Sequence, residues 1–133
     1  MKDYFGSKIQ TGSDIFFIFA GRWHRDTVAR IKGSVARVIH RPHNNKQVSL
    51  CLYLGSSRIV SSRHVAVDSI IHIGDIVAYR TYFDIKVKLG RVKDIKENDV
   101  LIDDESYPVS RETCLVLNTT SYQFEPRAKR LHV

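Results

Sequence analysis

A tryptophan flanked by cationic and imidazole side chains is the part of this sequence best suited to ligand chemistry. Trp23, the only tryptophan, lies in GRWHRD (Gly21–Asp26) beside Arg22, His24 and Arg25. An aromatic ring can stack on a base or a sugar while guanidinium groups reach the phosphates. We expect this stretch to form a loop after the preceding strand. In the alternative interpretation, Trp23 closes the core of its domain and its neighbours are only solvated.

The stretch HRPHNNK (His40–Lys46) is a second cationic segment, and its composition predicts a hairpin loop. Arg41, His43 and Lys46 in such a loop are suited to lie along a phosphate backbone. A solvated turn with no specific role is the alternative. The full set of predicted nucleic-acid contacts is Arg22, Trp23, His24, Arg25, Arg30, Lys32, Arg37, Arg41, His43, Lys46, Arg58 and Arg63.

The histidines and cysteines do not favour a metal site. His40 and His43 have a ligand-like spacing, but a closed zinc site needs four ligands, and neither Cys51 nor His64 has a partner at a suitable distance along the chain. Cys51 and Cys114 fall in strand-like segments, where a small apolar side chain is the common role. No nucleophile elbow, phosphate-binding loop or dinucleotide fingerprint occurs. We therefore expect no metal, no cofactor and no enzymatic activity.

The net positive charge is concentrated in the first half of the chain. The 133 residues include 21 Lys and Arg against 14 Asp and Glu, a net charge of +7. Residues 1–73 hold 11 basic and 4 acidic side chains, whereas residues 74–133 hold 10 of each. A basic half beside a neutral half favours one face built for a polyanion.

The hydropathy pattern does not favour a membrane or secreted protein. No apolar run approaches the roughly 20 residues that cross a bilayer, and MKDYFGSKIQ lacks the apolar core of a signal peptide. Two cysteines without C-x-x-C spacing suit a reducing compartment. We expect no membrane partner and a cytoplasmic location, which includes association with the nucleoid.

The elements that would position the candidate residues are short strands. Between Gly74 and Leu117, five strand-like runs alternate with turn residues. In KVKLGRVKDI, Val87 and Leu89 alternate with lysines, which is the period of two of a half-buried strand. Gly90 interrupts this run and predicts a bulge or bend, which a small barrel needs where one strand serves two sheets.

The first half of the chain repeats the same order of elements. The segment IVSSRHVAV (Ile59–Val67), for example, matches YPVSRETCLV (Tyr107–Val116), including a shared Ser-Arg pair. An internal repeat of this kind indicates two copies of one structural unit. We predict an all-β fold of two small five-stranded SH3-like barrels in tandem, packed together. Residues 1–70 would form the basic first barrel and residues 71–117 the second, with a short basic C-terminal tail at residues 118–133.

The pattern G-D-x-V, a loop, G-x-V-x-x-I, a turn and V-x-I resembles the KOW motif and, more broadly, the SH3-like barrels that include Tudor domains. The second half fills the pattern with Gly74, Asp75, Val77, Gly90, Val92, Ile95, Val100 and Ile102. The first half fills it less completely, with Gly33, Val35, Val38, Val48 and Leu50. Because KOW domains occur in ribosomal proteins and transcription elongation factors, the resemblance implies contact with nucleic acid or with the machinery that handles it.

The resemblance to Tudor domains also implies a candidate aromatic cage in the second barrel. Tudor domains hold a methylated Lys or Arg by cation–π attraction, and the corresponding aromatic residues here are Tyr79, Tyr82 and Phe83, with Tyr107 on a later strand. Binding of an unmodified protein partner by this neutral barrel is the favoured interpretation of these residues.

These features together favour a non-enzymatic nucleic-acid-binding protein. Its contacts would be directed at the backbone and largely independent of sequence, with duplex DNA favoured slightly over RNA, and it would modulate transcription or nucleoid complexes. The second barrel would brace the first or bind a protein partner. The alternative function is a protein-interaction adaptor, of the kind that a virus or phage encodes to modify a host complex, with its basic face against an acidic protein.

Overall fold

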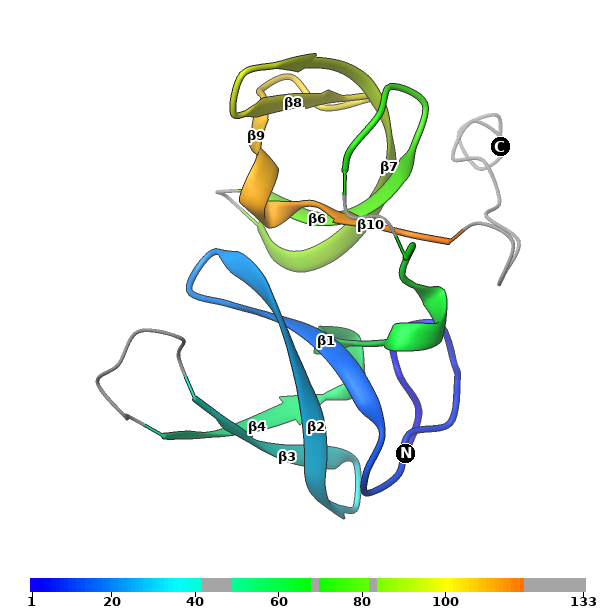
Figure 1. Ribbon diagram of the computed structural model, residues 1–133, viewed down its shortest axis with the longest axis vertical. Coiled ribbons are helices and arrows are strands. Elements are labelled where there is room, and N and C mark those ends of the chain that lie inside the picture. The colour runs from blue at the N-terminus through cyan, green and yellow to red at the C-terminus, as the bar shows by residue number, and fades with distance from the viewer. Residues whose placement is uncertain (42–48, 68–69, 82–83, 119–133) are drawn as a thin grey trace. The chain divides into compact units, whose positions relative to one another are not determined.

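The structure, a computed structural model, consists of strands joined by turns and short 3-10 segments. It describes residues 1–41, 49–67, 70–81 and 84–118, with backbone alone for residues 84 and 85. Two compact units, Met1–Ser62 and Arg63–Val133, each contain a five-stranded antiparallel sheet (Figure 1). The described residues include no α-helix and no helix long and apolar enough to span a membrane. The predicted all-β fold of two five-stranded units is confirmed.

The first unit orders its strands β4-β3-β2-β1-β5. β2 is long enough to serve two pairings, because its first half pairs with β1 and its second half with β3. The strands are β1 (Asp14–Phe19), β2 (Arg22–Lys32), β3 (Val35–His40), β4 (Leu50–Gly55) and β5 (Ile59–Ser61), with the 3-10 turn η1 (Ser56–Arg58) between the last two.

A register shift in β2 decides which of its side chains face the core. The pairing with β3 breaks after Val28, and Arg30 rather than Ala29 lies opposite Arg37. One extra residue in a strand reverses the faces of all the residues that follow it. Ile31 therefore packs against the core, and Arg30 lies on the outer face.

Alternating apolar side chains from these strands fill the core of the first unit. In β1, Ile15 and Phe17 are fully buried, as the period of two requires. Each fully buried residue of this kind stabilises the fold by about 1.5–3 kcal/mol. The buried core consists of Ile9, Ile15, Phe17, Val28, Ala36, Val38, Leu54 and Ile59.

The N-terminal segment is attached to β5 by one buried carboxylate. Asp3 accepts hydrogen bonds from the backbone N–H groups of Phe5 and Ser7, and also from that of Ser61 in β5. The Tyr4 N–H donates to the carbonyl of Ile59 at 2.8 Å. Residues near the N-terminus thus cover the outer edge of the sheet at β5.

The predicted loop at GRWHRD is wrong, because the chain turns earlier and the stretch begins β2. Ala20 and Gly21 both have positive φ, 53° and 79°, the combination that a two-residue type I′ hairpin requires. Such a tight turn leaves no loop, and Arg22 already pairs with Phe19 and Trp23 with Ile18.

The second unit repeats this plan with the strand order β10-β6-β7-β8-β9. Its long strand, β7, pairs with β6 and then with β8, and a register shift lies between Val92 and Asp94. Among the described residues, the strands are β6 (Ile76–Thr81), β7 (Asp84–Lys96), β8 (Asp99–Ile102), β9 (Val109–Ser110) and β10 (Leu115–Val116).

Gly90 lies where β7 passes from its pairing with β6 to its pairing with β8, the position for which a bulge or bend was predicted. No register shift falls at Gly90 itself, which pairs regularly with Val77, and its requirement has a packing reason. A Cβ at this position would lie 2.5 Å from Cγ2 of Ile102 and 3.0 Å from Cε1 of Tyr79. Gly90 is therefore required because two large core side chains occupy the space over its Cα.

The division between the two units falls between Ser62 and Arg63, whereas the sequence pattern predicted a boundary between about Asp68 and Gly74. Residues just after the division pair with the end of the second unit. Asn118 N donates to the His64 carbonyl at 2.6 Å, and Ala66 N donates to the Val116 carbonyl at 3.0 Å. These long-range hydrogen bonds leave no signature in the local alternation of apolar residues.

We expect Gly90→Ala to destabilise the second unit by about 1–3 kcal/mol, because the new methyl group overpacks the core against Ile102 and Tyr79. Urea denaturation followed by far-UV circular dichroism measures the change. Gly55→Ala is the matched control, because Gly55 is also a strand glycine without positive φ, and nothing lies within 4 Å of its Cβ position. Equal stability of the two variants would contradict the packing role of Gly90.

Candidate functional site

Arg25, a predicted nucleic-acid contact, is paired with an acid of its own unit. Its Nε lies 3.1 and 3.0 Å from the two carboxylate oxygens of Asp14, and its guanidinium carbon lies 5.5 Å from the centroid of the Phe16 ring. The hydrogen bond from Arg25 lowers the pKa of Asp14, so this carboxyl stays ionised and the pair persists at neutral pH. A phosphate would have to compete with Asp14 for Arg25.

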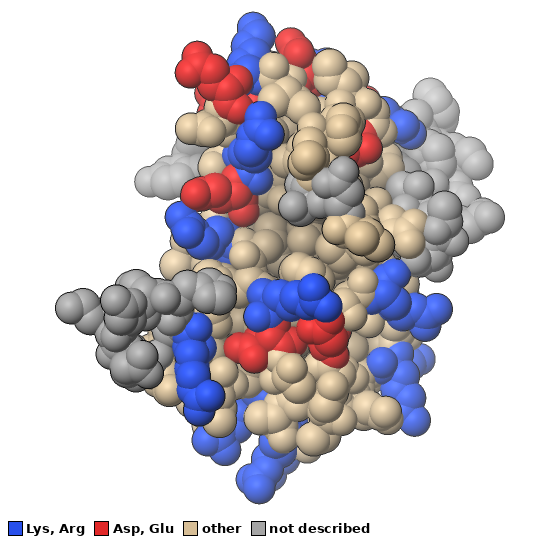
Figure 2. Space-filling view, viewed as in Figure 1, with Lys and Arg blue, Asp and Glu red and all other residues tan. Residues whose placement is uncertain are grey.

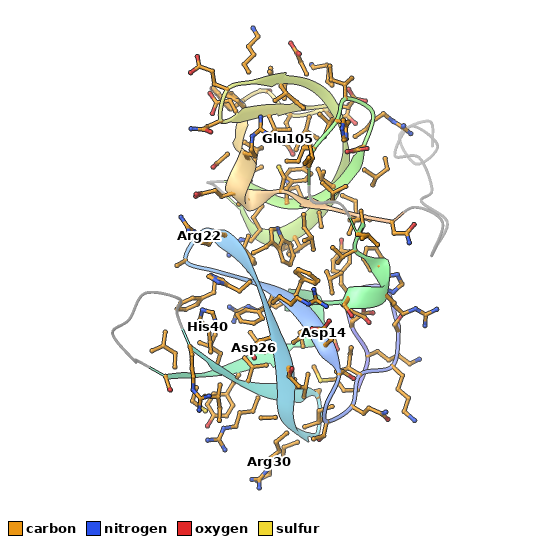
Figure 3. All side chains as sticks on the ribbon, viewed as in Figure 1. Asp14, Arg22, Asp26, Arg30, His40 and Glu105 are labelled. Carbon is orange, nitrogen blue, oxygen red and sulfur yellow. The ribbon has the colours of Figure 1, made fainter. Side chains whose placement is uncertain are left out.

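Trp23 and Arg22 lie at the start of β2. Figure 3 shows Arg22 beside the hairpin turn. Trp23 is half-buried and pairs across the strands with the buried Ile18, whereas Arg22 is exposed. A half-buried ring in a strand fits neither the expected exposed loop nor full burial in the core. The stacking role of Trp23 therefore stays a prediction.

His24, another predicted contact, belongs to a cluster of aromatic rings that sequence reasoning missed. Its ring lies 4.4 Å from that of His40, 5.7 Å from Phe17 and 6.1 Å from Phe19, measured between centroids. Its Nε2 lies 3.0 Å from the Phe19 carbonyl oxygen, a position that suits a hydrogen bond from the ring. The cluster assigns His24 a packing role inside the first unit.

His40 and Asp26 complete this cluster from β3 and β2 (Figure 3). His40 is 6% exposed, and its Nδ1 lies 3.6 Å from a carboxylate oxygen of Asp26. The two residues are distant in sequence, and the pairing of β2 with β3 and β1 brings them together. The alternation of VARVIH, which places His40 on the same face as Val38, was the only available signal.

A row of long polar side chains crosses the outer face of three strands of the first unit. Arg30 on β2 lies opposite Arg37 on β3, and Arg37 lies opposite Tyr53 on β4. Tyr53 is 64% exposed. We call this surface the basic–apolar face; its residues are Arg30, Lys32, Val35, Arg37, Ile39, Cys51 and Tyr53.

Apolar side chains accompany the cations on the basic–apolar face. Val35 and Ile39 are exposed at 37% and 39%, and Cys51 is also exposed. Arg37 Nε lies 2.7 Å from Cys51 Sγ, and this contact raises the pKa of the guanidinium, which remains fully charged. The face combines fixed positive charge with an aromatic ring and aliphatic groups.

The acids of the first unit do not neutralise this face. Residues 1–62 contain three acids, and each has a partner elsewhere: Asp3 binds backbone N–H groups, Asp14 binds Arg25, and Asp26 lies beside His40. On the side shown in Figure 2, the acidic colour in the first unit is confined to the region of Asp14 and Asp26, whereas both colours are interspersed over the second unit. The positive charge of the basic–apolar face is thus not balanced by an acid of the first unit.

The ten predicted nucleic-acid contacts that the structure describes do not all share one strand face. Arg30, Lys32 and Arg37 share the basic–apolar face, but Arg25 and His24 lie on opposite sides of β2. Four of the predicted cations that the structure describes remain. Arg22 is exposed at the start of β2, Arg41 is exposed after β3 with its Nε 3.3 Å from Ser49 Oγ, Arg58 is exposed in η1, and Arg63 is exposed at the start of the second unit. His43 and Lys46 lie outside the described residues.

Tyr79 is a core residue, so its predicted place in a surface aromatic cage is wrong. It is 1% exposed, and its hydroxyl donates to a carboxylate oxygen of Glu105 at 2.6 Å, which Lys88 Nζ approaches to 3.5 Å. Both faces of β6 are buried, so alternation could not reveal which face was the surface. Tyr107 is 72% exposed, and Tyr82 and Phe83 lie outside the described residues.

The part of the chain that the structure describes contains no group of three or more His, Cys, Asp or Glu side chains placed to hold a metal ion. The Tyr79–Glu105–Lys88 contacts and the His24–His40–Asp26 cluster are instead explained by packing and mutual hydrogen bonding or charge. The basic–apolar face is therefore the best-defined candidate for binding a partner.

We expect Cys51 to react with a thiol reagent much faster than Cys114. Burial raises the pKa of Cys114 to about 12, so almost none of it is the reactive thiolate at pH 8, whereas Cys51 is exposed on β4. Maleimide labelling at pH 8, followed by peptide mass spectrometry, measures both rates in one sample. Equal rates under native conditions would contradict the placement of the two thiols, and equal rates in urea would serve as the control.

No protein-family model matches the chain, and no curated protein matches it. Solved structures that resemble it over most of its length include the following two. The crystal structure of Arabidopsis thaliana AGDP1 AGD34 has a TM-score of 0.40 and 18% identity, and the match covers 81% of this chain and 82% of that chain. The crystal structure of ADCP1 tandem Agenet domain 3-4 has a TM-score of 0.41 and 18% identity, with coverage of 81% and 79%. At this identity, function must be inferred from the residues of this chain.

Proposed function

We propose that this chain is a non-enzymatic interaction module whose first unit binds an acidic protein segment on the basic–apolar face. The observation that carries the proposal is the row Arg30–Arg37–Tyr53 across the outer face, in a unit whose three acids are all engaged elsewhere. An acidic segment would satisfy the charge of this surface that no acid of the first unit balances.

The composition of the face favours a protein partner over nucleic acid. Protein interfaces are enriched in Tyr and Arg, and their centres exclude water with apolar groups such as the exposed Val35 and Ile39. A nucleic-acid site instead needs many cations along a regular phosphate backbone, and a strong salt dependence requires several phosphate contacts. The face offers Arg30, Lys32 and Arg37 in a compact patch. Arg25, another predicted contact, is instead engaged by Asp14.

This proposal moves the protein partner from the second barrel to the first. The sequence favoured the second barrel because of Tyr79, Tyr82, Phe83 and Tyr107. Of these, Tyr79 is buried and bonded to Glu105. The proposal keeps the alternative function predicted from the sequence, in which a basic face binds an acidic protein. Tyr53, which the sequence analysis did not select, takes the role of the exposed aromatic residue.

Replacing both arginines of the row, in Arg30→Gln with Arg37→Gln, should weaken binding of an acidic peptide by about tenfold or more, because each charged hydrogen bond contributes about 1.5–3 kcal/mol. The probe is an N-acetylated, fluorescently labelled peptide of ten alternating Glu and Val residues, titrated by fluorescence anisotropy. Lys2→Gln with Lys8→Gln is the matched control, because it removes the same charge from exposed positions of the same unit.

Duplex DNA and single-stranded RNA of matched net charge are titrated in parallel at two salt concentrations. The proposal fails if either nucleic acid binds more tightly than the peptide and its affinity falls steeply with salt. On duplex DNA, the slope of log affinity against log salt concentration is near −0.9 for each phosphate contacted, so several contacts give a slope of several times that value. It also fails if the control pair of lysines lowers peptide affinity as much as the arginine pair does.

Tyr53→Ala should weaken peptide binding by about threefold to tenfold and leave the melting temperature nearly unchanged, because the ring is mostly exposed in the free protein. Tyr107→Ala is the control, since Tyr107 is another exposed tyrosine but belongs to the second unit. The same anisotropy titration, together with thermal melting, measures both effects. A larger loss with Tyr107→Ala would place the peptide site in the second unit.

A further inference from the structure

We propose that the acidic segment binds as an added strand along the free edge of β4, an inference that rests on the proposed function of the basic–apolar face. β4 is the last strand of its sheet and pairs with β3 alone among the described residues. Among the described residues, the backbone hydrogen bonds outside the sheets do not involve any residue of β4. One side of its backbone therefore has N–H and C=O groups available for a further strand.

The edge of β4 lacks the features by which sheet edges usually avoid pairing. Its sequence, LCLYLG, contains no charged residue and no proline. Its register with β3 runs without a bulge from Val35–Gly55 to His40–Leu50, in contrast to the shifted pairing of β2 with β3. A regular, uncharged and unprotected edge is the kind that pairs readily with another chain.

The other sheet edges among the described residues are short or covered. β5 has three residues, and the N-terminal segment covers its edge through Asp3 and Tyr4. β9 and β10 have two residues each. β4, with six residues, is the longest edge strand and spans about 20 Å at roughly 3.3 Å per residue. It can pair with a segment of five or six residues.

Three cations lie near the two ends and the middle of β4, and this charge favours an acidic segment as the occupant. Arg41 lies before the strand, bonded to Ser49, and Arg58 lies directly after it in η1. Arg37 is in the middle, on the neighbouring strand opposite Tyr53. Roughly 10 Å, twice the strand spacing, separates an added strand from β3, and an arginine and a glutamate side chain can together span that distance.

Two other occupants fit this edge less well. A second copy of the chain paired through β4 would bring its own Arg37, Arg41 and Arg58 to the same edge, and like charges across paired strands are destabilising. A nucleic acid has no alternating amide and carbonyl groups and cannot continue the sheet. An acidic peptide satisfies both the charge and the backbone.

The test uses three forms of the alternating Glu–Val peptide with the unmodified protein. The first is the parent, the second carries N-methyl groups on every Glu nitrogen, and the third carries them on every Val nitrogen. All three have the same charge and side chains. In an added strand, alternate N–H groups point toward β4, so one methylated peptide should bind about tenfold or more weakly than the other. Hydrogen exchange should also slow at amides of β4 when the parent peptide binds.

The outcomes separate this inference from the proposed function. If the parent binds and both methylated peptides bind equally well, the acidic-face function stands and strand addition is overturned. If no form of the peptide binds, the proposed function fails, and the inference fails with it. Slowed exchange at β4 without peptide, together with a dimer in analytical ultracentrifugation, would show that a second copy occupies the edge and would overturn the acidic-segment proposal.

Discussion

The bend of one long strand is the constraint on which the rest of each unit depends. β2 in the first unit and β7 in the second pair with one neighbour and then with another, and a register shift lies at the start of the second pairing. Around β2, this arrangement closes five short strands over a core of eight buried side chains. The shift after Val28 also places Arg30 outside and Ile31 inside, so the same irregularity builds the core and the basic–apolar face.

The way each charged group is partnered determines what the surface of the first unit can bind. Asp3 holds the N-terminal segment to β5, and Asp14 and Asp26 pair with Arg25 and His40. Acids used in this way stabilise the fold and leave the outer face without a counter-charge from its own unit. The excess positive charge of the first half thus lies at particular surface positions, and the row that includes Arg37 joins three neighbouring strands.

Much of the fold could be predicted from local pattern, because apolar alternation is a property of neighbouring residues. The five strands of the second half, the repeat and the use of one long strand for two pairings were all predicted. The loop expected at Trp23 was wrong because a two-residue turn at Ala20–Gly21 takes its place. Gly90 was recognised as special, but its reason, the approach of Ile102 and Tyr79, depends on side chains from other strands.

The sequence by itself determined the strand content, the doubling of the unit and the excess of positive charge in the first half, since these follow from composition and from periodicity within short segments. Only the tertiary structure decided which charges are balanced and which rings are exposed. Tyr79, which was predicted as a binding residue, is buried, whereas Tyr53 is exposed. His24 packs with His40 in a cluster of rings. The physical reason is that strand register and bulges set the faces of side chains, and both are fixed by pairing between segments distant in the chain.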